Sequence, residues 1–204
     1  MALSLRLRRA SPRNPRLFWL GQLVSLTGTW MQTIGQSWLV LQLTGSPLAV
    51  GIVTALQTLP ILLFTLFGGV FADRVPKRKF LLLTQVISAL QALILGVLVY
   101  TGKVQLWEVY VLALILGVIN AFDNPTRQAF VVELVGRDDL PNAVALNSSL
   151  FNAARIIGPA VGGVLIAVVG IATAFFLNAA SFIAPIVALL LMRPEQFFNV
   201  PTPV

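Results

Sequence analysis

The sequence contains long stretches without any charged residue, and these constrain the fold more than any other feature. Each stretch lies between two charged residues: Arg16 and Asp73, Lys79 and Lys103, Glu108 and Asp123, and Arg155 and Arg193. A helix that crosses a bilayer needs about 20 mostly apolar residues. Only 10% of the residues are charged and 57% are hydrophobic, whereas a soluble domain carries about 25% charged residues. The sequence therefore predicts an all-α membrane protein.

The longest stretch is long enough for two spans, and the sequence Thr44-Gly45-Ser46-Pro47 divides it because Gly and Pro stop one helix and open the next. The last stretch divides in the same way near Gly170. We expect six transmembrane helices, at about residues 17–43, 48–72, 80–100, 106–123, 143–169 and 171–192. Residues 1–16 form a basic arm, and residues 193–204 begin a linker. The loop at 125–142 is long enough for a short interfacial helix over 127–135.

The distribution of Lys and Arg predicts the orientation in the membrane. Nearly all of the loop cations lie in the arm and in alternate loops: Arg6, Arg8, Arg9, Arg13, Arg16, Arg74, Lys77, Arg78, Lys79, Arg127, Arg137 and Arg193. Lys103 alone lies in a loop on the opposite side. Cytoplasmic loops of membrane proteins are enriched in Lys and Arg. We therefore expect both ends to be cytoplasmic, which requires an even number of spans.

The composition also excludes several functions. The chain has no Cys and no His, so disulfides, thiolate metal sites and His-based catalysis are ruled out. No phosphate-binding loop of the Walker type is present, and we expect no cofactor, no metal and no enzymatic activity. The formal charge of +7 is explained by loops that lie against anionic lipid head groups, and nucleic-acid binding is not expected.

The first predicted helix carries a polar stripe at alternating spacings of three and four residues, which places all its members on one face. Its members are Gln22, Ser25, Thr29, Gln32 and Gln36. Lipid would leave these groups without hydrogen bonds, so the face points inward. Two readings stay open: hydrogen bonding between helices, and the wall of a polar cavity. In the second reading, Gln32 and Gln36 line the substrate cavity.

The fifth predicted helix contains Arg155, the only charge well inside a span. A charge at that depth is unfavourable in lipid, so it faces protein or water. Asn152 shares its face, and the two residues are candidates for the substrate cavity; the alternative is an arginine that snorkels to the cytoplasmic surface. The run that follows contains Gly158, Pro159, Gly162 and Gly163. Small residues one turn apart allow helices to pack closely, and this run is a candidate helix-packing motif.

The segment between the second and third helices reads GVFADRVPKRK from Gly69 to Lys79. It resembles the signature G-x-x-x-D-R-x-G-R-R of the major facilitator superfamily, with Pro76 and Lys77 where that pattern has Gly and Arg. The resemblance implies a cytoplasmic gating loop that pairs with a carboxylate at the end of helix four. The residues that correspond are Gly69, Asp73, Arg74, Lys77, Arg78 and Asp123. We expect Asp73, Asp123, and either Lys77 or Arg78 to cluster.

Two further runs resemble the exporters of this superfamily, in its enterobactin-exporter-like and macrolide-efflux-like branch. They are the Gly-Pro run of helix five and the segment from Asn120 to Gln128. The resemblance implies the N-terminal six-helix half of a twelve-helix fold, built from two inverted three-helix units, with the C-terminal half missing. A complete six-helix protein is the other possibility.

The function that this resemblance implies is secondary active export of a small siderophore-like or drug-like molecule by alternating access. A proton is the candidate coupling ion, and its carrier belongs to either half. The expected location is a bacterial inner membrane, with lipid and the substrate as partners. The alternative is a membrane scaffold or assembly subunit that transports nothing.

Overall fold

The computed structural model describes residues 13–198, and these form α-helices and one short 3₁₀ helix, with no strand among them. The predicted all-α fold class is confirmed at this level. Residues 1–12 of the predicted arm and 199–204 of the predicted linker lie outside the described residues. The elements are α1 Arg13–Thr44, α2 Pro47–Arg74, α3 Lys77–Tyr100, α4 Leu106–Val135, α5 Leu140–Val169, α6 Ile171–Ser181, α7 Ile183–Leu191 and η1 Pro194–Gln196.

Helix α4 differs from the expectation, because it continues past Asp123 and through Pro125 to Val135. The separate interfacial helix over residues 127–135 is therefore wrong, since these residues are the last part of α4. Pro125 removes one backbone donor but does not end the helix. The helix ends instead at Gly136, whose φ of 77° is readily adopted only by glycine.

The last predicted span consists of two helices, α6 and α7, with Phe182 between them. Pro185 explains the interruption: it has no N–H, and its ring clashes with the carbonyl of the residue four positions earlier, Ser181. Taken together, Ile171–Leu191 is still long and apolar enough to cross a membrane.

Five segments of the described chain have the length and hydropathy of a membrane span: α2, α3, α4, α5 and α6 with α7. Helix α1 is not among them, although its 32 residues exceed the length required. It buries Gln22, Ser25, Gln32 and Gln36 on one face, and such residues lower its hydropathy. Two expectations stay predictions: that α1 is the sixth span, and that the helices form two inverted repeats.

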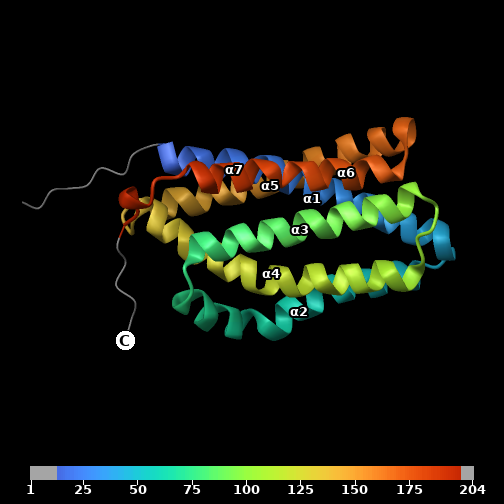
Figure 1. The fold of residues 1–204 in the computed structure, drawn as a ribbon, viewed down its shortest axis with the longest axis horizontal. Coiled ribbons are helices and arrows are strands. Elements are labelled where there is room, and N and C mark those ends of the chain that lie inside the picture. The colour runs from blue at the N-terminus through green and yellow to red at the C-terminus, as the bar shows by residue number, and fades with distance from the viewer. Residues whose placement is uncertain (1–12, 199–204) are drawn as a thin grey trace, which may run out of the picture.

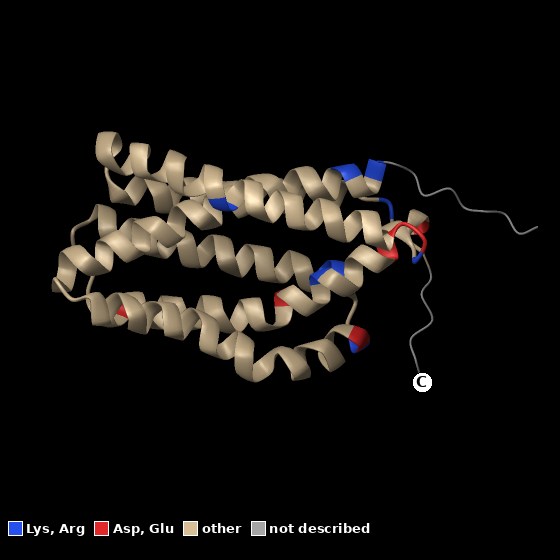
Figure 2. Ribbon diagram, turned by 180° about the vertical axis from the view of Figure 1, so that it is seen from behind, with Lys and Arg blue, Asp and Glu red and all other residues tan. Residues whose placement is uncertain are grey.

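The helices lie side by side along the long axis of an elongated bundle, and both ends of the described chain lie at the same end of it (Figure 1). The most extensive contacts join α2 to α4, α1 to α5, and α3 to α6. Lys and Arg gather toward the end from which both termini leave (Figure 2). The remainder of the bundle carries few charges, as expected of helices surrounded by lipid.

Glycines set the closest helix contacts. A Cβ atom added to Gly68 of α2 would lie 2.6 Å from the carbonyl oxygen of Ala121, and one added to Gly117 of α4 would lie 2.6 Å from that of Leu56. The backbones of α2 and α4 therefore approach too closely for any larger residue at these two positions.

Among the five apolar segments, α2 and α5 have the smallest share of buried residues. Only 11% of the apolar window of α2 and 17% of that of α5 are buried, against 39% for α3 and α4. Their outer faces therefore have no protein partner among the described residues.

Candidate functional site

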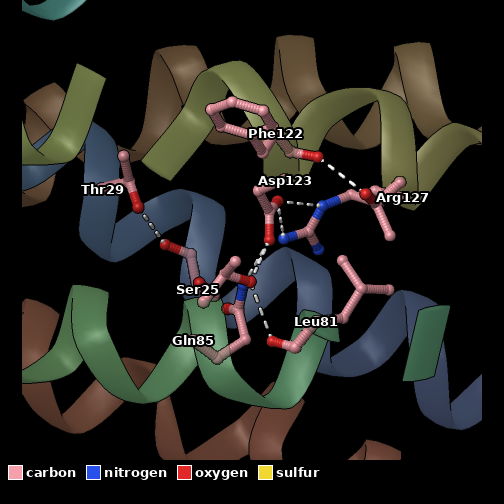
Figure 3. A network of polar contacts seen from close by, with 9 residues as sticks. Ser25, Thr29, Leu81, Gln85, Phe122, Asp123 and Arg127 are labelled. Carbon is pink, nitrogen blue, oxygen red and sulfur yellow. Dashed lines mark hydrogen bonds and ion pairs between the residues drawn. The ribbon is translucent and has the colours of Figure 1, made fainter. Parts of the chain in front are cut away.

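Asp123 of α4 is the centre of a buried polar network between α3 and α4 (Figure 3). Its Oδ2 accepts a hydrogen bond of 2.9 Å from Nε of Arg127 and a second from the same guanidinium. Its Oδ1 accepts hydrogen bonds from the Thr84 hydroxyl and, at 3.3 Å, from Nε2 of Gln85. The carboxylate is 5% exposed and the guanidinium side chain 19%, so the network holds a buried ion pair.

The local sequence explains how this network forms. Arg127 lies one helical turn after Asp123, and side chains four residues apart on a helix lie side by side. Opposite them, α3 carries a buried polar stripe of its own: Thr84, Gln85, Ser88 and Gln91. The two helices therefore meet through polar faces inside an otherwise apolar bundle.

A polar cavity of about 160 Å³ adjoins the network, with room for several water molecules. It lies between α1, α3, α4 and α5, and the polar residues that line it are Gln22, Ser25, Thr29, Gln85, Ser88, Asn120, Asp123, Asn124, Arg127 and Asn147. Oε1 of Gln85 is buried here without a hydrogen-bond partner among the described residues. The cavity thus offers hydrogen-bonding groups, and one ion pair, to water or to a ligand.

The predicted cavity residues Gln32 and Gln36 do not line this cavity; they form hydrogen bonds between helices. Gln32 donates to Gln91 at 3.1 Å and accepts from Asn178 at 2.8 Å, and Gln36 accepts from Gln57 at 3.1 Å. Gln32 is 2% exposed and Gln36 1%. The bonds show the first reading of the polar stripe, hydrogen bonding between helices, and a role in a substrate cavity stays a prediction for both residues.

The structure does not bring the predicted gating cluster together. Lys77 pairs with Glu133 at 2.9 Å rather than with Asp123, and Arg78 donates to the carbonyls of Leu189 and Leu190 at the end of α7. The reason is that α4 extends beyond Asp123, so that Glu133, about 15 Å further along the helix, is the carboxylate at the end that the loop reaches.

Asp73 and Arg74 are exposed at the end of α2, and Gly69 has open space beside its Cα. These residues border a groove of about 640 Å³ between α2, α4 and α5, with Gly69 and Asp73 in its lining. An acid and a glycine one turn apart on an exposed face leave room for another helix to approach closely.

On α5, Asn152 and Arg155 are both exposed. Asn152 donates to the Ser148 carbonyl of its own helix at 2.9 Å, and the Arg155 guanidinium lies over the Trp30 ring, 5.6 Å from its centroid. In the candidate packing motif, Gly158 and Gly162 lie directly against α1, at Trp30 and Met31 respectively.

Of the other two members of that motif, Pro159 lies half-buried inside α5. A Cβ added to Gly163 would have no atom within 4 Å. The motif therefore has one face against α1 and one free face.

Three residues of this site, Thr84, Gln85 and Gln91, are not among those predicted from the sequence. Their signal was present, because Thr84, Ser88 and Gln91 have the same helical spacing that identified the stripe of the first helix. The predicted end of the fourth helix at Asp123 leaves Arg127 outside the helix, so the pairing of these two residues one helical turn apart is not among the predictions. Among the described residues, no group of three or more His, Cys, Asp and Glu side chains is placed to hold a metal.

The long apolar helices, packed around a cavity lined by polar residues and a buried ion pair, define a multi-pass membrane protein. Residues 11–201 match the family described as transmembrane secretion effectors, and the chain belongs to this family of the major facilitator superfamily. The predicted family is confirmed. No solved structure matches the chain.

The chain is similar to named transporters of several bacteria. It is 31% identical over 183 residues to the staphyloferrin A transporter of Staphylococcus aureus, which covers 89% of this chain and 45% of that protein. It is 32% identical over 190 residues to the multidrug efflux pump Tap of Mycolicibacterium fortuitum, with 90% and 46% covered. It is 26% identical over 150 residues to macrolide efflux protein A of Streptococcus pyogenes, with 74% and 37% covered. The chain thus spans less than half the length of these relatives.

Proposed function

We propose that this chain is the N-terminal six-helix half of a secondary active exporter of a small molecule, which works by alternating access together with a second half. The observation that carries the proposal is the cavity lined by polar side chains beside the buried pair Asp123–Arg127, because charged residues kept inside a membrane bundle mark substrate or ion pathways. The names of the relatives, a siderophore transporter and efflux pumps, support export. They do not favour a scaffold that transports nothing.

The second half packs, in this proposal, on the outer faces of α2 and α5. These two helices bury the least surface in the bundle, and the groove at Gly69 and Asp73 lies between them at one end. Asp73 there accepts hydrogen bonds from the N-terminal end of a helix of the other half. Arg74, Lys77 and Arg78 complete the gating loop, with Lys77 bound to Glu133. The segment from residue 193 onward leads to the second half.

The substrate cavity forms between the two halves in this proposal. Arg155 and Asn152 line it from α5, and the polar cavity at Asp123 opens into it. Gln32 and Gln36 hold α1 against α2, α3 and α6 beneath it. Because Gly158 and Gly162 fix α5 against α1, the two helices present their polar groups as one rigid surface.

The proposed location is a bacterial inner membrane with both ends of this half in the cytoplasm, and a proton is the proposed coupling ion. The gathering of Lys and Arg at one end of the bundle supports this orientation (Figure 2). This half contains no Cys, so single cysteines introduced at Arg74 and Arg137 report the topology. Both should be labelled by an impermeant maleimide from the cytoplasmic side only, and labelling from opposite sides would contradict the orientation.

Transport itself is tested with the full-length protein in inverted membrane vesicles, using accumulation of ethidium and of a labelled macrolide after a pH gradient is imposed. Asp73→Asn should abolish accumulation, since the contact with the second half loses its charge. Asp139→Asn, which changes an exposed acid in the loop before α5, is the matched control and should transport normally. Two results together would indicate a scaffold instead: the wild-type protein transports neither compound nor any siderophore, and the Asp73→Asn variant still binds the same partner proteins as the wild type.

A further inference from the structure

Arg155 is a cation near the middle of α5 that no carboxylate of this half neutralises. It takes part in neither the Lys77–Glu133 nor the Arg127–Asp123 ion pair, and its guanidinium lies over the Trp30 ring instead. Its side chain is exposed on the bundle. A guanidinium that faces lipid at this depth is unfavourable, so the surface around Arg155 faces water, a ligand or the other half.

The guanidinium of Arg155 lies on the ring of Trp30, and this ring packs against a second aromatic ring. The guanidinium carbon lies 5.6 Å from the centroid of the Trp30 ring, at a distance where a cation is attracted to the ring face. Trp30 meets Phe151 edge to face, with ring centroids 5.6 Å apart and planes at 72°. The Cβ of Trp30 packs closely on α5, since a Cβ at Gly158 would lie 2.5 Å from it. The guanidinium thus lies on a pair of aromatic rings at the contact between α1 and α5.

This group continues the polar cavity along α5. Asn147, Phe151 and Arg155 lie four residues apart in succession, and therefore on one face of the helix. Asn147 and Phe151 line the cavity that contains Asp123 and Arg127, so Arg155 lies one turn beyond its lining. Asp123 and Arg127 neutralise each other within that cavity, which leaves the charge of Arg155 uncompensated and the combined surface positive.

We propose that Arg155, Trp30 and Phe151 form a subsite for an anionic ligand, in which a carboxylate binds the guanidinium and a planar apolar body packs on the two rings. The inference rests on the proposed exporter and names its substrate class. A guanidinium matches a carboxylate through two parallel hydrogen bonds, and a planar apolar group gains contact area on aromatic rings.

The test measures binding to the full-length protein in detergent by equilibrium dialysis, with two probes that differ only in charge: coumarin-3-carboxylate and coumarin-3-carboxamide. The wild-type protein should bind the carboxylate about tenfold more tightly, the factor contributed by one charge-assisted hydrogen bond. Arg155→Gln should remove this preference and leave carboxamide binding unchanged, and Arg155→Lys should retain part of it. Trp30→Leu should weaken both probes. Arg137→Gln, at an exposed arginine outside the bundle core, is the matched control and should keep the full preference.

Several results would overturn the subsite. The first is that the wild-type protein binds both probes equally or binds neither. The second is that the Arg155→Gln variant still binds the carboxylate more tightly than the carboxamide. A wild-type preference for the carboxamide would show that a carboxylate of the second half occupies Arg155, and it also overturns the inference. Thermal unfolding of each variant, followed by tryptophan fluorescence, separates lost binding from lost folding.

The same samples distinguish this inference from the proposed function. If the preference for the carboxylate depends on Arg155 but the vesicles accumulate no compound, the subsite is supported and the exporter is contradicted. If the vesicles accumulate ethidium or the macrolide but the preference for the carboxylate does not depend on Arg155, the exporter is supported and the subsite is contradicted.

Discussion

Removing the charge of Asp123 should destabilise the bundle more than any other single loss of a charge in the described chain. Asp123→Asn keeps the shape of the side chain but leaves the Arg127 guanidinium without its counter-charge. The two side chains are 5% and 19% exposed, and breaking a buried ion pair on one side costs about 3–5 kcal/mol. Because Arg127 borders a cavity with room for water, we expect the lower end of that range, about 3 kcal/mol.

Two comparisons make the reasoning specific to a buried charge. Lys77→Met breaks the ion pair with Glu133 at the end of the bundle and leaves behind a carboxylate that is 27% exposed, so it should cost less, about 1 kcal/mol. The double variant Asp123→Asn with Arg127→Gln removes both charges, so it should recover most of the loss. Its free energy of unfolding should return to within about 1 kcal/mol of the wild-type value.

The assay is unfolding of the detergent-solubilised protein by a titration with sodium dodecyl sulfate, followed by tryptophan fluorescence. The chain has four Trp residues, and none is changed by these substitutions. The reasoning is refuted if Asp123→Asn is no less stable than Lys77→Met, or if the double variant is as unstable as Asp123→Asn alone.

Further predictions concern packing and the amide network. Gly68→Ala should lower the free energy of unfolding by about 1–3 kcal/mol, because its Cβ would lie 2.6 Å from the Ala121 carbonyl oxygen; Gly69→Ala is the control, since it meets no atom within 4 Å, and an equal loss would contradict the packing. Gln91→Leu should cost about 1–3 kcal/mol, because Nε2 of the buried Gln32 loses its acceptor; an unchanged stability in the same titration would show that water replaces the bond.

The positions of the transmembrane helices follow from the sequence almost directly. Charged residues cannot remain in hydrocarbon, so the gaps between them outline the spans before any packing is known. The turn at Gly45 and the start of α2 at Pro47 agree with this rule, and so does the boundary at Gly170. The break at Phe182 could have been predicted from Pro185, because a proline disturbs the helix up to four residues before it.

The end of α4 could not be read in the same way. A proline following two polar residues, Asp123 and Asn124, predicts a boundary by local preference. In the bundle, Pro125 lies inside α4 against α2, with its Cγ 3.0 Å from the position of a Gly68 Cβ. Packing between α2 and α4 therefore outweighs the lost backbone hydrogen bond, and such a contact between distant segments leaves no local signal.

The sequence by itself determined that this chain is a helical membrane protein, because hydropathy and charge placement are local properties of the chain, and its glycine–acid–basic segment carried the resemblance to the major facilitator superfamily. Only the tertiary structure decided which polar groups meet. It paired Asp123 with Arg127, Lys77 with Glu133, and Arg155 with Trp30. Partners are selected by the register and crossing of helices, which depend on close contacts such as those of Gly68 of α2 with α4 and of Gly158 of α5 with α1.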